Sequence, residues 1–180
     1  MGQLRVFAAV SLPNDVRQAL AEQTAEWDIP GRRVPPSNWH ITLRFLGEIE
    51  EVTCDRYKAA LDESQLGKPF RIRLSGFGAF PNQRKATVVW AGVGPGADRL
   101  FELAEACDSA AEATGVSPED RPFSPHLTLS RVRPPAPVVS LIEQGELDIS
   151  WWVGQIVLFE SIGGRGGVRY EPLEFFPFSR

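Results

Sequence analysis

The chain has 180 residues, of which 43% are hydrophobic and 23% charged, and its formal net charge is −4 at pH 7. A globular chain of this size buries enough surface to fold without a structural metal or a disulfide framework. The negative charge disfavours tight, sequence-independent binding of long nucleic acid, although a few arginines suffice to recognise one terminal phosphate. We therefore predict one domain over residues 1–180, built from two similar lobes.

Neither a membrane span nor a targeting signal is predicted. No segment approaches the roughly 20 apolar residues that a bilayer requires, and the short apolar run at residues 4–12 leads directly into a predicted helix. The two cysteines, Cys54 and Cys107, are too few for a metal cluster and fall in helix-like stretches, so we expect buried free thiols. A cytoplasmic location fits reduced thiols. We expect a monomer without an obligate protein partner.

Hydrophobic periodicity predicts an alternation of strands and helices. The strands are expected at 5–11, 39–46, 70–80, 86–93, 123–132, 147–160 and 168–175, and the helices at 13–27, 50–65, 97–114 and 137–144. Strands 70–80 and 86–93 form a hairpin. The glycines at 92–96 lack the lysine and the spacing of a phosphate-binding loop, so we interpret them as a linker. Intermixed strands and helices with a hairpin predict an α+β fold.

Both histidines of the chain lie in the same four-residue pattern, His-aliphatic-Thr-aliphatic. The first copy is His-Ile-Thr-Leu at 40–43, and the second is His-Leu-Thr-Leu at 126–129. The copies lie 86 residues apart, close to half the chain, and each follows a loop that contains proline and serine. This repetition indicates an internal duplication in which each lobe contributes one strand to a shared groove.

The spacing within each copy suits acid–base chemistry. Side chains alternate between the two faces of a strand, so His40 shares a face with Thr42, and His126 shares one with Thr128. Two imidazoles near neutral pH can supply one acid and one base for displacement at phosphorus, and threonine hydroxyls can donate to the non-bridging oxygens. A zinc site is the alternative, but catalytic zinc normally needs three protein ligands, and no further ligand stands at helical spacing beside either histidine. We expect no metal and no cofactor.

These motifs and their surroundings resemble the two-histidine phosphoesterase superfamily, and within it the RNA 2',3'-cyclic phosphodiesterases of the ThpR/LigT type. The resemblance spans nearly the whole chain and includes residues 5–9, 34–36, 40–47, 78–81, 90–93 and 123–131. It implies a bilobal α+β fold with pseudo-twofold symmetry and metal-independent hydrolysis of RNA 2',3'-cyclic phosphate ends to 2'-phosphates. It also implies that His40 donates the proton to the leaving 3'-oxygen and that His126 activates water. The near-symmetric motifs themselves do not rank these roles.

Three further residues are candidates for contact with the substrate. Strand parity places Arg44 on the face of His40, so the residues favour it as a phosphate contact. Arg131 has the opposite parity to His126, yet the resemblance favours it as a ligand contact, which requires a bulge between them. Phe7 lies on a face with small and polar residues and could stack on a base, although a core role is also open. Trp151 and Trp152 point to opposite faces and are assigned to packing.

Other functions remain open at this stage. Within the same chemistry, the protein could join RNA ends through a 2',5' linkage, cleave 2',5'-oligonucleotides or open a small cyclic nucleotide. Ligation is formally the reverse of cyclic phosphate opening, with a ribose 5'-hydroxyl in place of water. A non-catalytic module that binds nucleotides or RNA ends is the alternative from another class. It is disfavoured because binding alone does not require two acid–base groups.

Overall fold

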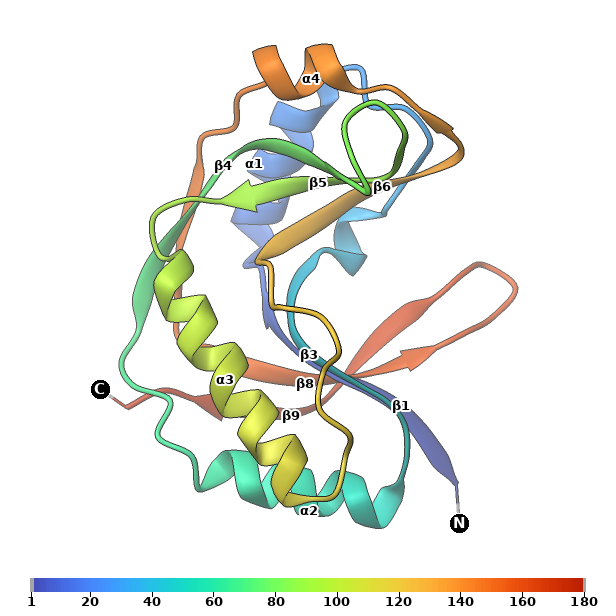
Figure 1. Cartoon of the computed structure of the whole chain (residues 1–180). Coiled ribbons are helices and arrows are strands. Elements are labelled where there is room, and N and C mark those ends of the chain that lie inside the picture. The colour runs from blue at the N-terminus through green and yellow to red at the C-terminus, as the bar shows by residue number, and fades with distance from the viewer. Residues whose placement is uncertain (1, 180) are drawn as a thin grey trace.

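The computed structural model describes residues 2–179 and has an α+β architecture, as predicted (Figure 1). The helical elements are α1 (Asn14–Ala25), η1 (Pro36–Asn38, a 3-10 turn), α2 (Glu51–Asp62), α3 (Ala97–Ala113) and α4 (Val139–Gln144). The strands are β1 (Gln3–Ser11), β2 (Arg32–Arg33), β3 (His40–Glu50), β4 (Phe70–Phe80), β5 (Ala86–Val93), β6 (His126–Ala136), β7 (Ile149–Val153), β8 (Gln155–Ile162) and β9 (Arg169–Pro177).

One antiparallel sheet joins the strands in the order β7-β4-β5-β6-β3-β1-β8-β9, with β2 paired to β6. β3 and β6 meet at a single residue pair, Ile41 opposite Leu127. We call the strands on one side of this pair the β6 half (β7, β4, β5, β6 and β2) and those on the other the β3 half (β3, β1, β8 and β9). The order is symmetric about the central pair, so β3 corresponds to β6, β1 to β5, β8 to β4 and β9 to β7. This correspondence is the pseudo-twofold relation expected from the duplicated motif.

Two of the helices, α1 and α3, connect the two halves. α1 follows β1 but contacts β7 of the β6 half, whereas α3 follows β5 but contacts β3 of the β3 half. α2 also contacts the β3 half, and α4 contacts β4. Figure 1 shows α2 and α3 beside the lower strands and α1 and α4 beside the upper ones. The halves therefore cover each other's apolar faces and share one core.

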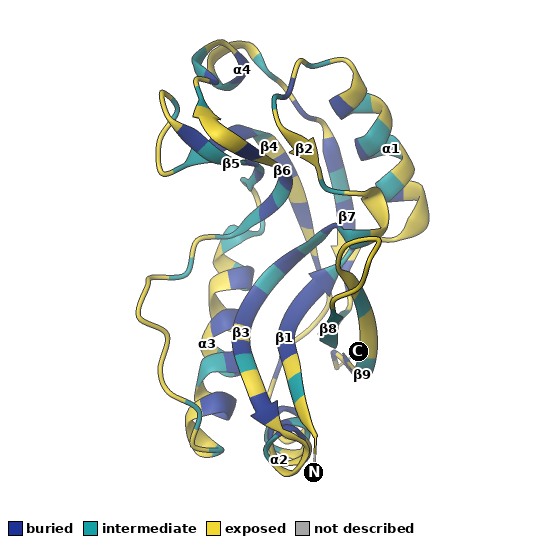
Figure 2. Cartoon of the chain, turned by 90° about the vertical axis from the view of Figure 1, so that its right-hand side faces the viewer, coloured by how far each residue is buried: buried dark blue, intermediate teal, exposed yellow. Residues whose placement is uncertain are grey.

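The core explains why the aliphatic motif positions are apolar. Ile41 and Leu127 are fully buried, and Leu43 and Leu129 nearly so. Figure 2 shows the buried colour along the middle of β1 and β3, with exposed residues toward their outer ends. Burial of these four side chains removes apolar surface from water, which stabilises the fold by about 25 cal/mol per Å² buried. This burial holds the two central strands against the helices.

Several local signals act as expected, and one element differs from the prediction. Gly115 follows α3 with φ of 84°, the left-handed conformation that ends helices at glycine. Cys54 and Cys107 are buried free thiols, and Trp151 is buried while Trp152 is 65% exposed. The single strand predicted at 147–160 is wrong. The chain breaks at Gly154, and β7 and β8 belong to opposite halves of the sheet.

Candidate active site

The central pair of the sheet brings the two motifs together. Partner residues of an antiparallel pair point to the same face, and Ile41 and Leu127 both point into the core. Their neighbours in the motifs, His40, Thr42, His126 and Thr128, therefore share the opposite face, which we call the histidine face. Continuing the antiparallel register sets His40 across from Thr128 and His126 across from Thr42. Each imidazole thus has the hydroxyl of the other copy as its cross-strand neighbour.

Both imidazoles are oriented by the same hydrogen bond. Nδ1 of His40 lies 2.8 Å from the carbonyl oxygen of Asn38, and Nδ1 of His126 lies 2.7 Å from that of Ser124. A carbonyl oxygen only accepts, so Nδ1 carries a proton in each ring and donates it. Nε2 is then the position that exchanges protons: it holds a lone pair in the neutral ring and a proton in the imidazolium. This is the arrangement that a base and an acid both need.

Aromatic rings pack around His40 from three strands. Its ring centroid lies 4.8 Å from that of Phe7 on β1, 5.0 Å from Tyr170 on β9 and 6.5 Å from Phe159 on β8. Phe7 also contacts Tyr170 and Phe159, and it is only 3% exposed. Phe7 therefore packs against the His40 ring as part of this cluster. Its stacking on a base stays a prediction.

His126 has a different aromatic setting. Phe80 on β4 meets it edge-on at 5.0 Å, and Trp90 on β5 lies 6.1 Å away. Trp90 fits because Gly78 stands opposite it in the register: a Cβ at Gly78 would lie 2.0 Å from the indole ring. Trp90 pairs with Thr128, and Ala9 pairs with Thr42. Ala9 is therefore the residue of the β3 half that corresponds to Trp90. The two histidines thus have equivalent backbones but unlike neighbours.

Both motif strands contain a bulge at the same position. On β3, Leu43 has no partner between the pairs formed by Thr42 and Arg44. On β6, Leu129 has none between the pairs formed by Thr128 and Ser130. One extra residue reverses the alternation of side chains beyond it. The bulge that Arg131 requires is therefore present, and Arg131 lies exposed on the histidine face.

The same bulge turns Arg44 away from the histidine face, so the parity prediction for this residue is wrong. Arg44 is 4% exposed, and its Nε donates to Asp108 of α3 at 2.9 Å. Its Nη atoms donate to the carbonyl oxygens of Phe45 and Ser117, and Glu119 lies 3.5 Å away. Arg44 therefore ties β3 to the segment that leads into His126 rather than to a substrate.

Ser130 occupies the equivalent position on β6 and makes the reciprocal connection. Its buried hydroxyl lies within hydrogen-bonding distance of the carbonyl oxygens of Pro30 and Arg32, in the segment that leads into His40. Each motif strand is thus bonded, four residues after its histidine, to the segment that delivers the other histidine. Sequence patterns do not reveal either contact, because the partners lie 64 to 100 residues apart.

The surroundings of His40 oppose its protonation in the free protein. Burial lowers the pKa of His40 to about 4, and the positive charges of His126, Arg17 and Arg131 add to the effect. The hydrogen bond to Asn38 acts in the opposite direction.

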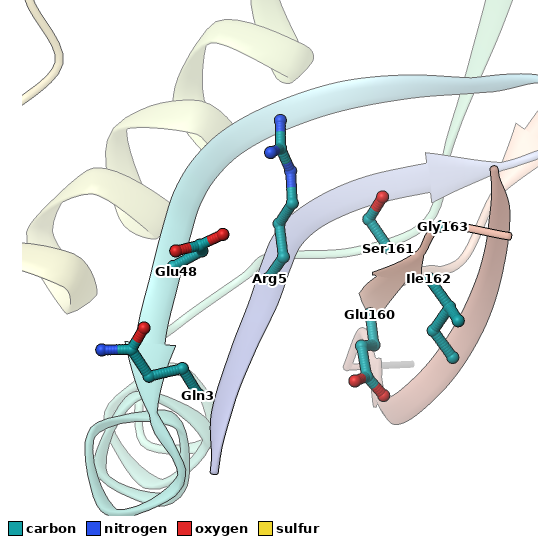
Figure 3. Close-up of a pocket in the computed structure, with 7 residues that line it drawn as sticks. All are labelled: Gln3, Arg5, Glu48, Glu160, Ser161, Ile162 and Gly163. Carbon is teal, nitrogen blue, oxygen red and sulfur yellow. The ribbon is translucent and has the colours of Figure 1, made fainter.

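A separate hollow of about 430 Å³ lies at the other end of β1, lined by Arg5, Glu48, Glu160 and neighbouring residues. Figure 3 shows Arg5 on β1 between the side chains of β3 and those of β8. The guanidinium of Arg5 also lies 5.1 Å from the ring of Phe45. Two carboxylates against one guanidinium make this hollow a poor site for a phosphate, so the histidine face remains the candidate site.

Sequence reasoning missed the aromatic residues that surround the histidines, namely Tyr170, Phe159, Phe80 and Trp90. Their spacing along the chain carries no signal, because strand pairing alone brings them to the site. Among residues 2–179, no three His, Cys, Asp or Glu side chains are grouped as a metal site. Within the same described range, no helix is long and apolar enough to cross a membrane.

Comparison with known proteins gives two matches to one family description. The description of LigT-like phosphoesterases matches residues 10–90 and again residues 92–170. One motif lies in each matched range, so the duplication seen in the sheet is also a duplication of sequence. Together the two ranges cover most of the chain.

Two curated relatives match this chain over about nine tenths of their length. The RNA 2',3'-cyclic phosphodiesterase of Aeropyrum pernix is 37% identical over 159 residues, covering 86% of this chain and 90% of the relative. The protein of the same name from Thermus thermophilus is 37% identical over 182 residues, covering 96% and 89%. Among solved structures, E. coli LigT complexed with 3'-AMP has a TM-score of 0.82 at 28% identity, covering 99% of each chain.

Proposed function

The chain belongs to the LigT-like phosphoesterase family, and on this basis we propose that it hydrolyses RNA 2',3'-cyclic phosphate ends to 2'-phosphomonoesters. The observation that supports this most directly is the pair of imidazoles on one sheet face, each with Nδ1 bound to a backbone carbonyl. Relatives that bear the name RNA 2',3'-cyclic phosphodiesterase support the substrate class. Nucleotide binding by a similar fold supports the same class.

In the proposed reaction, Nε2 of His126 takes a proton from a water molecule as its oxygen attacks the phosphorus. The bond from phosphorus to the 3'-oxygen breaks, and Nε2 of His40 gives its proton to that oxygen. Thr42 and Thr128 donate hydrogen bonds to the non-bridging oxygens, and Arg131 adds a charged donor on the same face. No step requires a metal or a cofactor, because two histidines carry both protons.

The donor role of His40 requires that it gain a proton when substrate binds. With a pKa of about 4, His40 is neutral at pH 7 in the free protein. A bound cyclic phosphate places a negative charge beside the ring, which favours the imidazolium and raises this pKa. Binding of substrate and protonation of His40 are therefore coupled. Activity should fall at high pH when His40 loses its proton. This fall should occur at a higher pH in the profile of kcat than in that of kcat/KM, because kcat/KM reports the free enzyme.

The test is turnover of an oligoribonucleotide that ends in a 2',3'-cyclic phosphate, in the presence of EDTA. The expected product is the 2'-phosphate, identified by its resistance to enzymes that remove only 3'-phosphates. His40→Ala and His126→Ala should each lose most activity. Absence of turnover by the unmodified protein, turnover that stops with EDTA, or full activity of either variant would contradict the proposal.

The same assay measures the competing reactions. An added oligonucleotide with a free 5'-hydroxyl reports 2',5' ligation, and a 2',5'-linked dinucleotide reports cleavage of that linkage. A non-catalytic binding module would bind the cyclic phosphate without converting it in any of these assays. The organisation as one domain, the monomeric state and the cytoplasmic location remain predictions, which sizing by light scattering and cell fractionation can check.

A further inference from the structure

Charge is distributed unequally over the two halves of the sheet. The strands of the β6 half contain no aspartate or glutamate, and their charged residues are Arg32, Arg33, Arg71, Arg73, Arg131 and Arg133. The strands of the β3 half contain five glutamates (Glu48, Glu50, Glu160, Glu171 and Glu174) and three arginines (Arg5, Arg44 and Arg169), a net charge of −2 against +6 for the β6 half. A polyanion that enters the histidine face is therefore attracted toward the β6 half and repelled by the β3 half.

Two arginines of the β6 half face each other directly. Arg32 on β2 pairs with Arg131 on β6 in antiparallel register, and both are exposed. Like charges directly opposite on neighbouring strands are destabilising. Within residues 2–179, neither guanidinium has a carboxylate or carbonyl partner. Their neighbour Arg33, by contrast, donates to the carbonyl oxygens of Thr24 and Trp27. Anions bound at Arg32 and at Arg131 would offset this repulsion.

The pair lies close to the motif residues but beyond them. Arg131 follows Thr128 by three residues, which corresponds to about 10 Å along β6 or slightly less because of the bulge. Partner residues share a face, so Arg32 points to the histidine face with Arg131. A guanidinium nitrogen of Arg32 also comes within 3.9 Å of where a Cβ on Gly167 would lie. The β8–β9 loop is held nearby, because Asn38 Nδ2 donates to the carbonyl oxygen of Val168 at 2.8 Å.

We propose that Arg32 binds the phosphate one nucleotide upstream of the reacting one, so that this protein selects oligonucleotide ends over isolated nucleoside cyclic phosphates. The proposal rests on the proposed function and names its substrate class more closely. In an RNA chain that ends in a 2',3'-cyclic phosphate, the next phosphate is joined to the 5'-oxygen of the terminal nucleotide. Arg131 holds the cyclic phosphate, and Arg32 across the strand pair takes the 5'-phosphate. Arg133, two residues further along β6 and also exposed, continues the basic surface.

A pair of substrates that differ only in this phosphate tests the assignment. Cytidine 2',3'-cyclic phosphate lacks it, and the same nucleoside with an added 5'-phosphate has it. The unmodified protein should show kcat/KM about tenfold higher with the 5'-phosphate, as expected for one charge-assisted contact. Arg32→Gln should abolish this preference while leaving turnover of cytidine 2',3'-cyclic phosphate unchanged. Arg32→Lys should retain part of it, because charge remains but the bidentate geometry is lost.

A matched control removes a charge elsewhere. Arg56→Gln takes the same charge from an exposed position on α2, in the β3 half, and should leave the preference intact. The proposal is overturned if the unmodified protein treats the two substrates alike, if Arg32→Gln keeps the preference, or if Arg56→Gln removes it to the same extent. It is also overturned if Arg32→Gln lowers turnover of both substrates equally, because Arg32 would then stabilise the fold rather than bind the 5'-phosphate.

A binding measurement keeps this test independent of turnover. Calorimetry compares cytidine 2'-phosphate with cytidine 2',5'-bisphosphate for the unmodified protein and for Arg32→Gln. A gain of about tenfold in affinity from the 5'-phosphate, lost in the variant, supports the subsite even if the protein hydrolyses nothing. Equal affinities would overturn the subsite even if hydrolysis is observed. With a single-stranded oligonucleotide, Arg32→Gln should reduce the slope of log affinity against log salt by about 0.7.

Discussion

The β3 half and the β6 half contain the same arrangement of motif residues in different surroundings. Both contribute a histidine, a threonine two residues later, an Nδ1 bond to the carbonyl two residues before, and a bulge after the threonine. The side chains at equivalent positions then differ. Ala9 corresponds to Trp90, and Phe45 corresponds to Arg131, by register with the motifs. Duplication thus accounts for two equivalent histidine–threonine pairs, whereas the neighbouring side chains differ between the halves.

The difference between the halves also gives the histidine face two unlike sides. The β3 half places aromatic rings around His40 and carries glutamates on its outer strands. The β6 half places arginines beyond His126 and carries no carboxylate on its strands. An apolar side and a cationic side on one face suit a nucleotide, which has an apolar base and a charged backbone.

The largest effect is expected when either histidine is removed. His40→Ala and His126→Ala should each lower kcat by about 10²–10⁴-fold, the usual contribution of a positioned acid or base. A substrate with sulfur in place of the 3'-oxygen separates the roles. A thiolate leaves without a proton more readily than an alkoxide, so this substrate should restore turnover by His40→Ala but not by His126→Ala. Rescue of His126→Ala alone would reverse the assignment of acid and base.

Stability should be more sensitive at Arg44 than at Ser130, although the positions are equivalent. Arg44→Met removes a buried guanidinium that bonds Asp108 and two carbonyl oxygens, and it should cost about 3 kcal/mol of unfolding free energy. Ser130→Ala removes one hydroxyl shared between two carbonyl oxygens and should cost about 1 kcal/mol. Urea denaturation followed by fluorescence measures both. Equal losses would mean that the two reciprocal connections contribute alike.

Stability should fall as the pH decreases from about 6.5 to about 4 because of His40. Burial lowers the pKa of His40 from 6.5 to about 4, so the unfolded chain binds a proton in this range that the folded protein does not. The contribution of His40 is fully present above the unfolded pKa and is lost as the pH falls, by about 3 kcal/mol. Urea denaturation at a series of pH values should show this loss. A His40→Gln variant, which does not titrate, should lack this part of the dependence.

An effect on stability is also expected at the contact that distinguishes the two aromatic settings. In Gly78→Ala, the new Cβ would lie 2.0 Å from the ring of Trp90, so the indole must move and its contact with His126 must change. Such overpacking typically costs about 1–3 kcal/mol. Gly154→Ala serves as the control, because a Cβ there would meet nothing within 4 Å. Comparable stability of the two variants in thermal unfolding would show that Trp90 adjusts freely.

Much of the fold could be predicted because its signals are local. Alternating apolar residues mark most strands, α1 begins one residue after the predicted start at Pro13, and Gly115 follows the end of α3. The long strand at 147–160 was predicted wrongly because β7 and β8 are both strands with apolar residues. One glycine between them gives little sign that they lie at opposite ends of the sheet.

The sequence by itself predicted the two histidines that we propose as proton carriers and their threonine partners, because a repeated pattern with period-two spacing puts histidine and threonine on one face in each strand. It did not determine which arginine lies on the histidine face. That depends on one unpaired residue in each strand, Leu43 and Leu129, and neither is a glycine or proline that would mark a bulge. Only pairing with β1 and β5 shows the extra residue, which buries Arg44 and exposes Arg131. Tertiary structure likewise decided that Arg32 stands opposite Arg131, because contacts between distant segments leave no periodic trace along the chain.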